Sequence, residues 1–69
     1  RKAVQSYAGT DRQVRGRLLD VLRAAETPVD RAALDAVWAD AAQRDRCLFS
    51  LLEDGLTEQL PDGRFALPA

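Results

Sequence analysis

Residues 40–56 constrain the fold most strongly, because this stretch carries helix signals at both of its ends. Asp40 can cap the first turn by accepting a hydrogen bond from a free backbone N–H, and Gln43 can reach back to the cap, as in a capping box. Gly55 can adopt the positive φ that ends many helices, and Leu56 can then fold back onto the last turn. We therefore predict a helix that starts after Asp40 and stops before Gly55.

A first helix is predicted from Thr10 onward, because Thr10 followed by Gln13 is again a capping-box pattern. The apolar residues that follow recur at helical spacing and predict one buried stripe: Val14, Leu18, Val21, Leu22 and Ala25. The same helix leaves four arginines on its solvated side, namely Arg12, Arg15, Arg17 and Arg23. They form either an ordinary solvated face or a patch that contacts phosphate.

A second helix is predicted after Pro28, because proline disfavours helical geometry at the residue before it. Val29 is placed to form a short extended segment, and Asp30 is placed to cap the helix. The predicted buried face consists of Ala33, Leu34, Val37 and Trp38. Trp38 is expected in the core or at the corner before the third helix, and stacking on a nucleic-acid base is the alternative.

Two strands are predicted after the third helix, at residues 57–60 and 64–67, with a strong Pro-Asp-Gly turn signal between them. The side chains expected to pin this hairpin to the helices are Leu60 or Phe65, together with Leu67. Three helices followed by a two-stranded wing form the pattern of a winged helix-turn-helix. The predicted fold class is therefore mostly α with a small β-hairpin.

The predicted domain covers residues 10–69, and residues 1–9 are interpreted as a linker or arm. At 69 residues there is room for one small domain and little room for an enclosed active site. The sequence begins without methionine, so we expect a piece of a longer protein.

The candidate DNA-binding side chains lie on the first half of the third helix and at the tip of the wing. A helix-turn-helix protein reads DNA with the N-terminal part of its recognition helix. The candidates are Gln43, Arg44, Arg46, Ser50 and, on the wing, Arg64. Arg44 and Arg46 could equally pair with Asp40, Asp45 or neighbouring helices, and Arg64 could equally be an ordinary exposed residue. Phe49 lies off the apolar stripe and is expected to pack under the wing or to mark an interface.

The charge distribution weighs against strong autonomous DNA binding. Residues 1–31 hold seven basic and four acidic side chains, whereas residues 32–69 hold three basic and seven acidic ones. Phosphate neutralisation supplies most non-specific affinity for DNA. The half that contains the predicted reading helix is the acidic half.

No catalytic constellation or cofactor motif is visible in the sequence. There is no histidine, and Cys47 is the only cysteine, which excludes an internal disulfide and a zinc site built on cysteines. Cys47 is expected to be a small buried apolar group. No apolar run approaches the length of a membrane span, and we expect a cytoplasmic protein without a membrane partner.

Three segments, residues 8–23, 28–38 and 54–68, resemble the C-terminal region of A/G-specific adenine DNA glycosylases from high-GC bacteria. The run Gly-Thr-Asp-Arg-Gln-Val-Arg-Gly at residues 9–16 is the most specific part. The resemblance implies a parent hydrolase that removes adenine mispaired with guanine or 8-oxoguanine in base-excision repair. It also implies an upstream helix-hairpin-helix catalytic domain with a four-iron four-sulfur cluster. None of the family's catalytic acids or cluster cysteines maps onto this chain.

The function expected from the resemblance is a non-catalytic winged-helix module that helps the parent enzyme to bind double-stranded DNA. Two alternatives remain. One is the DNA-binding domain of a transcriptional regulator, for which a basic recognition helix would be expected. The other is a protein-interaction winged helix that packs on its own catalytic domain or on a repair partner, which the acidic second half and Phe49 favour. A fold does not by itself decide between them.

Overall fold

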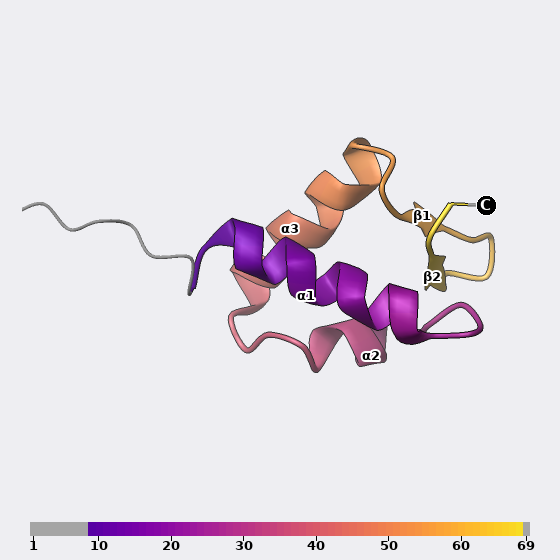
Figure 1. Ribbon diagram of the computed structural model, residues 1–69, viewed down its shortest axis with the longest axis horizontal. Helices are drawn as coiled ribbons and strands as arrows, with labels where there is room; N and C mark the ends of the chain where they lie inside the picture. Colours follow the sequence, from indigo (N-terminus) through magenta and orange to yellow (C-terminus); the bar gives the residue numbers. More distant parts are fainter. Residues whose placement is uncertain (1–8, 69) are drawn as a thin grey trace, which may run out of the picture.

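A computed structural model describes residues 9–68 of the chain, so all but Gly9 of the predicted arm lies outside the described residues. It contains three helices and a two-stranded antiparallel hairpin, in the predicted order (Figure 1). The elements are α1 (Asp11–Ala24), α2 (Arg31–Asp35), α3 (Ala41–Glu53), β1 (Glu58–Gln59) and β2 (Phe65–Ala66). The prediction of a mostly helical chain with a small hairpin is confirmed.

α1 begins at the predicted cap and buries the predicted stripe. The backbone N–H of Gln13 donates to Thr10 Oγ1 over 3.3 Å. Gln13 Oε1 in turn accepts from the N–H of Gly9, one residue before the cap, over 2.6 Å. Val14, Leu18 and Leu22 are buried, and Val21 and Ala25 are half-buried. The N–H of Gln13 in the first turn and the N–H of Gly9 before the cap are thereby satisfied, in a variant of the capping box that is shifted by one residue.

α2 ends before Val37 and Trp38, two residues of its predicted buried face. It ends at Asp35, and the Asp30 side chain makes no capping hydrogen bond; the N–H of Ala33 instead donates to the Asp30 carbonyl over 3.1 Å. Leu34 is buried, whereas Ala33 is exposed, so its predicted burial is wrong. The predicted side-chain cap at Asp30 is wrong too. With only five residues, α2 covers the core with a single fully buried side chain.

α3 ends as predicted at Gly55, which has a φ of 76°. The N–H of Leu56 donates to the Leu51 carbonyl over 3.0 Å, and the N–H of Gly55 donates to the Leu52 carbonyl over 3.1 Å. This pair of contacts is a Schellman motif. The chain at Leu56 therefore folds back onto the last turn, as predicted, while Leu56 itself stays 44% exposed.

The hairpin pairs Glu58 with Ala66 and Gln59 with Phe65, over shorter strands than predicted. Val29 forms an additional antiparallel bridge: its N–H and carbonyl exchange two hydrogen bonds of 2.8 Å with Phe65. The predicted extended segment at Val29 is therefore confirmed. It ties the connection between α1 and α2 to the hairpin.

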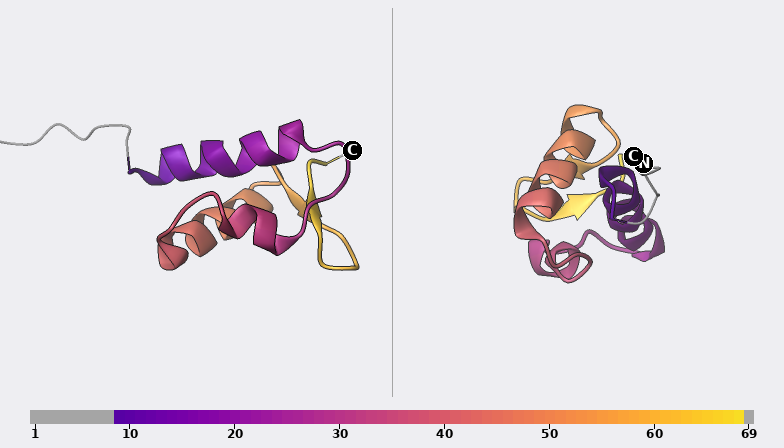
Figure 2. Two further views of the ribbon diagram at one scale, coloured as in Figure 1. Left: turned by 90° about the horizontal axis from the view of Figure 1, so that it is seen from below. Right: turned by 90° about the vertical axis from the view of Figure 1, so that its left-hand side faces the viewer.

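The core lies where α1 packs against α2 and α3, and the hairpin closes it beside the C-terminal end of α1 (Figures 1 and 2). The buried hydrophobic residues are Val14, Leu18, Leu22, Leu34, Cys47, Leu48, Leu51 and Phe65. Phe65 is the buried anchor of the hairpin, while Leu60 is half-buried and Leu67 is exposed. Within residues 9–68, no helix is long and apolar enough to cross a membrane.

Candidate functional site

The outward side of α3 is the surface on which the sequence predicts DNA contact. Its exposed residues recur at helical spacing and are named here the α3 face: Ala42, Asp45, Arg46, Phe49 and Glu53. The α3 face carries one basic and two acidic side chains, together with an aromatic ring. Of the predicted site residues on the helix, Arg46 is the one that belongs to it.

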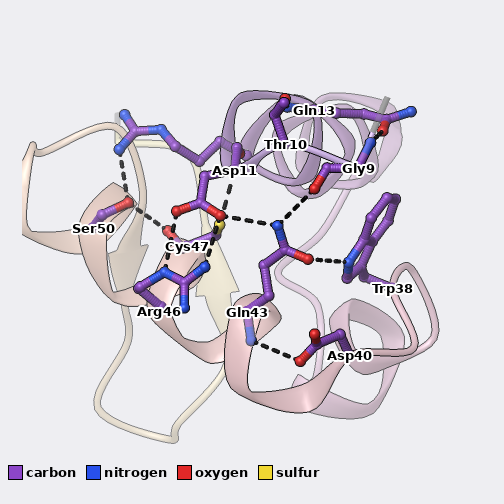
Figure 3. Close-up of polar contacts among 11 residues, drawn as sticks. Gly9, Thr10, Asp11, Gln13, Trp38, Asp40, Gln43, Arg46, Cys47 and Ser50 are labelled. Carbon is purple, nitrogen blue, oxygen red and sulfur yellow. Dashed lines mark hydrogen bonds and ion pairs between the residues drawn. The ribbon is translucent and has the colours of Figure 1, made fainter. Parts of the chain in front are cut away.

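Gln43 points from α3 toward the start of α1 and joins three segments (Figure 3). Its Nε2 donates to the Gly9 carbonyl over 3.0 Å and to Asp11 Oδ1 over 2.9 Å. Its Oε1 accepts from Trp38 Nε1 over 2.8 Å. The backbone N–H of Gln43 donates to Asp40 Oδ1 over 3.1 Å, which confirms the predicted cap. The predicted return of the Gln43 side chain to that cap is wrong, because the amide is used across the helix interface.

Arg44 turns inward, and its side chain is only 14% exposed. Its Nη1 donates to the Asp35 carbonyl over 3.1 Å and to the Trp38 carbonyl over 2.7 Å. Its Nε lies 3.2 Å from Asp35 Oδ1. Arginine near a helix C-terminus satisfies carbonyls that have no partner within the helix. Arg44 therefore fastens the end of α2 to α3, and its predicted outward projection is wrong.

Arg46 faces Asp11 across the interface between α3 and α1 (Figure 3). Its Nε donates to Asp11 Oδ2 over 3.1 Å and its Nη2 donates to Oδ1 over 2.8 Å. Hydrogen bonds from Arg46 and then from Gln43 lower the pKa of Asp11 to about 2. The Arg46 side chain nevertheless remains 60% exposed.

Ser50 is half-buried between α3 and α1, where its hydroxyl accepts from Arg15 Nη1 over 2.7 Å and donates to the Cys47 carbonyl over 2.8 Å. Arg15 Nη2 also pairs with Asp54 Oδ2 over 2.9 Å. Arg15 was predicted on a solvated face or a phosphate patch. It crosses to α3 instead, so the interpretation of a free solvated arginine is wrong for this residue.

The other arginines of α1, Arg12, Arg17 and Arg23, are exposed, as predicted for a solvated face. Arg23 pairs with Asp20 one turn earlier over 3.0 Å. This exposed pair lies in the C-terminal half of α1, away from the start of the helix where Arg46 meets Asp11.

Arg64 lies in the hairpin and pairs with Asp62 of the same turn. Its Nε donates to Asp62 Oδ2 over 2.8 Å, and its backbone N–H donates to Oδ1 over 3.0 Å. The backbone contact first, and the side-chain contact second, lower the pKa of Asp62. The Arg64 side chain is 43% exposed.

The structure thus brings three of the five predicted residues together. One edge of α3 carries Gln43, Arg46 and Ser50, which contact α1. Arg44 points inward and contacts the end of α2. Arg64 lies on the hairpin, away from these residues. Sequence reasoning allowed ion pairs for Arg44 and Arg46 but did not identify Asp11 and Asp35 as the partners. Asp11 lies 35 positions from Arg46, and a separation of this kind leaves no periodic signal.

Cys47 is buried, and burial raises the pKa of its thiol. Its Sγ lies 3.7 Å from the Asp11 carbonyl oxygen. An iron–sulfur cluster needs several cysteine thiolates, and this chain has one. In the described part of the chain, no group of three or more histidine, cysteine or acidic residues could hold a metal ion. The residues present do not fit a cluster.

Comparison with known proteins gives a clear similarity. The chain is 72% identical over 67 residues to an adenine DNA glycosylase of Mycolicibacterium smegmatis, and this match covers 96% of the chain and 23% of the relative. It is 71% identical over 65 residues to an adenine DNA glycosylase of Mycobacterium tuberculosis, covering 93% of the chain and 21% of the relative. The chain therefore spans less than a quarter of the length of these relatives.

No protein-family model matches the chain, and no solved structure matches it. The similarity to curated relatives falls on their C-terminal part and extends over almost every residue of this chain. The resemblance drawn from the sequence is confirmed: the chain is closely similar to the C-terminal part of adenine DNA glycosylases from mycobacteria.

Proposed function

We propose that this chain is the non-catalytic C-terminal module of an adenine DNA glycosylase that acts in the cytoplasm. The parent enzyme would remove adenine from A:G and A:8-oxoguanine mispairs in base-excision repair. The identity of 72% over 96% of the chain carries this proposal. Catalysis and the iron–sulfur cluster would belong to another part of the longer protein, because the chain holds no histidine and a single, buried cysteine.

We further propose that residues 10–69 form a winged-helix module, with residues 1–9 as the arm that leads to it. Two observations support this interpretation. The helices and the hairpin follow in the order of a winged helix-turn-helix. The bridge between Val29 and Phe65 adds a third strand position between α1 and α2.

The module would help the enzyme to bind duplex DNA through Arg46 and Arg64. Both guanidinium groups are at least 43% exposed, and both pair with carboxylates that are themselves exposed. Because both carboxylates are exposed, a phosphate can approach the two guanidinium groups and compete with the carboxylates for them. Arg44 has no such role, because its exposure is low and its donors hold main-chain carbonyls. Gln43 and Ser50 would act as positioning residues for α3.

Contacts of this kind would position the duplex and would carry no sequence information. Extrusion of the adenine would remain the task of the preceding part of the enzyme. The net charge of −1 predicts weak binding by the module alone. A tether to a second DNA-binding domain would still make a weak contact useful, because it raises the effective concentration of the module near DNA.

A protein-interaction module is the second candidate function. The observation that favours it is the α3 face, with two acidic side chains, one basic side chain and the exposed Phe49 ring. A transcriptional regulator has no comparable support, since the relatives in the comparison are named as glycosylases.

A titration of the chain with a fluorescent duplex, with and without an 8-oxoguanine–adenine mismatch, at two salt concentrations tests the DNA proposal. We expect the Arg46→Ala, Arg64→Ala double variant to bind more weakly and to lose about one unit of salt slope per phosphate contact. The Arg17→Ala, Arg23→Ala double variant removes the same two charges from exposed arginines of α1 and serves as the matched control. Equal losses in both variants would show a net-charge effect and would contradict the proposed contacts.

A further inference from the structure

A hollow of about 270 Å³ opens between α3, the start of α2 and the hairpin. Its apolar lining consists of Leu48, Phe49, Leu52 and Phe65, and charged side chains of Arg31 and Asp45 border it. We name it the Phe49 hollow. It lies outside the contacts between α1 and α3 that hold Gln43, Arg46 and Ser50, and the proposed DNA contacts do not use it.

Phe49 is 63% exposed, although its neighbour Leu48 belongs to the core. Single exposed apolar residues are common on protein surfaces and need no explanation. Phe49 differs because Leu48 and Phe65, both almost fully buried, line the same hollow. An inserted side chain would contact the core and would cover the aromatic ring at the same time. A phenylalanine side chain can bury about 150–250 Å² in such a contact.

We propose that the Phe49 hollow receives an apolar side chain from the preceding part of the same glycosylase polypeptide. The module would then dock on its own enzyme. This inference rests on the proposed function in one respect, that the chain is the C-terminal module of a longer adenine DNA glycosylase. It does not depend on DNA contact by Arg46 or Arg64.

The size of the hollow favours an occupant in the same polypeptide. A separate protein partner needs an interface of about 1,000 Å² or more. The Phe49 hollow accommodates about one large side chain, and one buried apolar side chain gives an affinity of roughly millimolar or weaker. A tethered segment has an effective concentration in the millimolar range, so it would occupy such a site far more often than a free partner at micromolar concentration. More than three quarters of the length of the relatives lies outside the match, so a long tethered partner exists in them.

The charges around the hollow favour a protein segment over nucleic acid. Arg31 is shared between two carboxylates, Asp35 and Asp45, so the three side chains together carry a net negative charge that disfavours a phosphate. Glu53 adds a further negative charge to the exposed side of α3. The α3 face therefore has a net charge of −1, which suits an apolar side chain flanked by a basic one.

Site-directed photo-crosslinking in a full-length adenine DNA glycosylase that carries this segment tests the inference. Position 49 would carry p-benzoylphenylalanine in place of Phe49. Leu56, which is also exposed but does not line the hollow, would be replaced in the same way as the matched control. We expect a crosslink within one polypeptide from position 49 to a peptide of the preceding part, at several times the yield from position 56.

Three results would overturn the inference: no crosslink at position 49, equal yields at the two positions, or crosslinks only between two separate molecules. Phe49→Ser provides a second readout, because loss of docking should increase amide hydrogen exchange in the peptide that the crosslink identifies. The DNA titration described above is independent of both measurements. An intact crosslink from position 49 without DNA binding by the chain would defeat the DNA proposal alone. DNA binding by the chain without that crosslink would defeat the docking proposal alone.

Discussion

Arg46 of α3 and Asp11 of α1 hold each other through two hydrogen bonds, of 3.1 and 2.8 Å, across the main helix interface. The same carboxylate accepts a third hydrogen bond, from Gln43. Asp11 is also the first residue of α1, where a negative charge interacts favourably with the helix dipole. The contact therefore stabilises the packing of α3 on α1 and competes with any phosphate for Arg46.

Replacing Asp11 with asparagine should strengthen DNA binding if Arg46 contacts phosphate. The Asp11→Asn side chain keeps an oxygen acceptor for Gln43 but loses the charge that neutralises Arg46. We expect tighter binding and a salt slope steeper by up to about one unit, measured by duplex titration at several salt concentrations. Asp20→Asn removes the same charge from the Arg23 pair and is the control. Weaker or unchanged binding in Asp11→Asn, relative to that control, would count against Arg46 as a phosphate contact.

The depressed pKa of Asp11 predicts a loss of stability in acid. Its folded pKa is about 2, below the value of about 3.9 that is typical of an unfolded aspartate. The stabilisation is therefore complete above the unfolded pKa and is lost as the pH falls through the folded pKa. Asp62, whose pKa is also lowered, contributes in the same direction. Thermal unfolding from about pH 5 to about pH 2 should show this decline, with a smaller slope in Asp11→Asn; identical slopes would exclude the Arg46 pair as its source.

The features that sequence reasoning placed correctly depend on residues close together in the chain. The caps at Thr10 and Asp40 and the stop at Gly55 each involve partners within five positions. The hydrogen bonds of a cap or of a Schellman motif are fixed by local geometry. The extended segment at Val29 was also predicted, but its bridge to the distant Phe65 was not. Local chemistry was sufficient for the caps and the helix end.

The candidate site was harder, because the direction of each side chain depends on which element covers it. Gln43, Arg46 and Ser50 lie at spacings of three and four on one stripe of α3, which the sequence shows. The stripe contacts α1 through residues 32 to 35 positions away, which the sequence does not show. Arg44 turned inward because the carbonyls at the end of the short α2 need donors. No sequence signal marks the end of α2 at Asp35. The contact of Arg44 with the Asp35 carbonyl could therefore not be predicted.

Removal of the Gln43 amide should destabilise the domain and change the environment of Trp38. Gln43→Ala leaves Trp38 Nε1 and the Gly9 carbonyl without their partner. Trp38 Nε1 is part-buried, so loss of its partner should cost about 1 kcal/mol, whereas the exposed Gly9 carbonyl can bind water instead. Gln59→Ala, which removes an exposed hydrogen bond in the hairpin, should have little effect. Trp38 is the only tryptophan, so its fluorescence reports on this site directly. A wild-type emission spectrum and unfolding midpoint in Gln43→Ala would contradict the bridging role.

Leu51 and Phe49, two apolar residues of α3, should respond differently to truncation. Leu51 is fully buried at the centre of the core, and Leu51→Ala should cost about 2–5 kcal/mol because it removes contacts and leaves a cavity. Phe49→Ala on the same helix removes an exposed ring and should change the stability of the isolated chain by about 0.5 kcal/mol or less. Urea unfolding of the two variants side by side checks both values. A large loss in Phe49→Ala would show that the ring packs within the domain and would weaken the docking proposal.

Replacement of Gly55 by asparagine should cost less stability than replacement by alanine. The difference is expected from the backbone conformation and not from steric clashes. A Cβ atom added at Gly55 would meet no other atom within 4 Å, so any loss of stability must come from the backbone conformation. At a φ of 76°, an alanine occupies the left-handed region at a cost of about 1–2 kcal/mol. Asparagine adopts this region more readily than alanine, and the Gly55→Asn variant should lose less. Urea midpoints at an unchanged m value measure the two losses. If Gly55→Ala matches the wild type, the helix end must rearrange without the Schellman motif, and the hydrogen bond from the Leu56 N–H to the Leu51 carbonyl should then become exchangeable in hydrogen-exchange experiments.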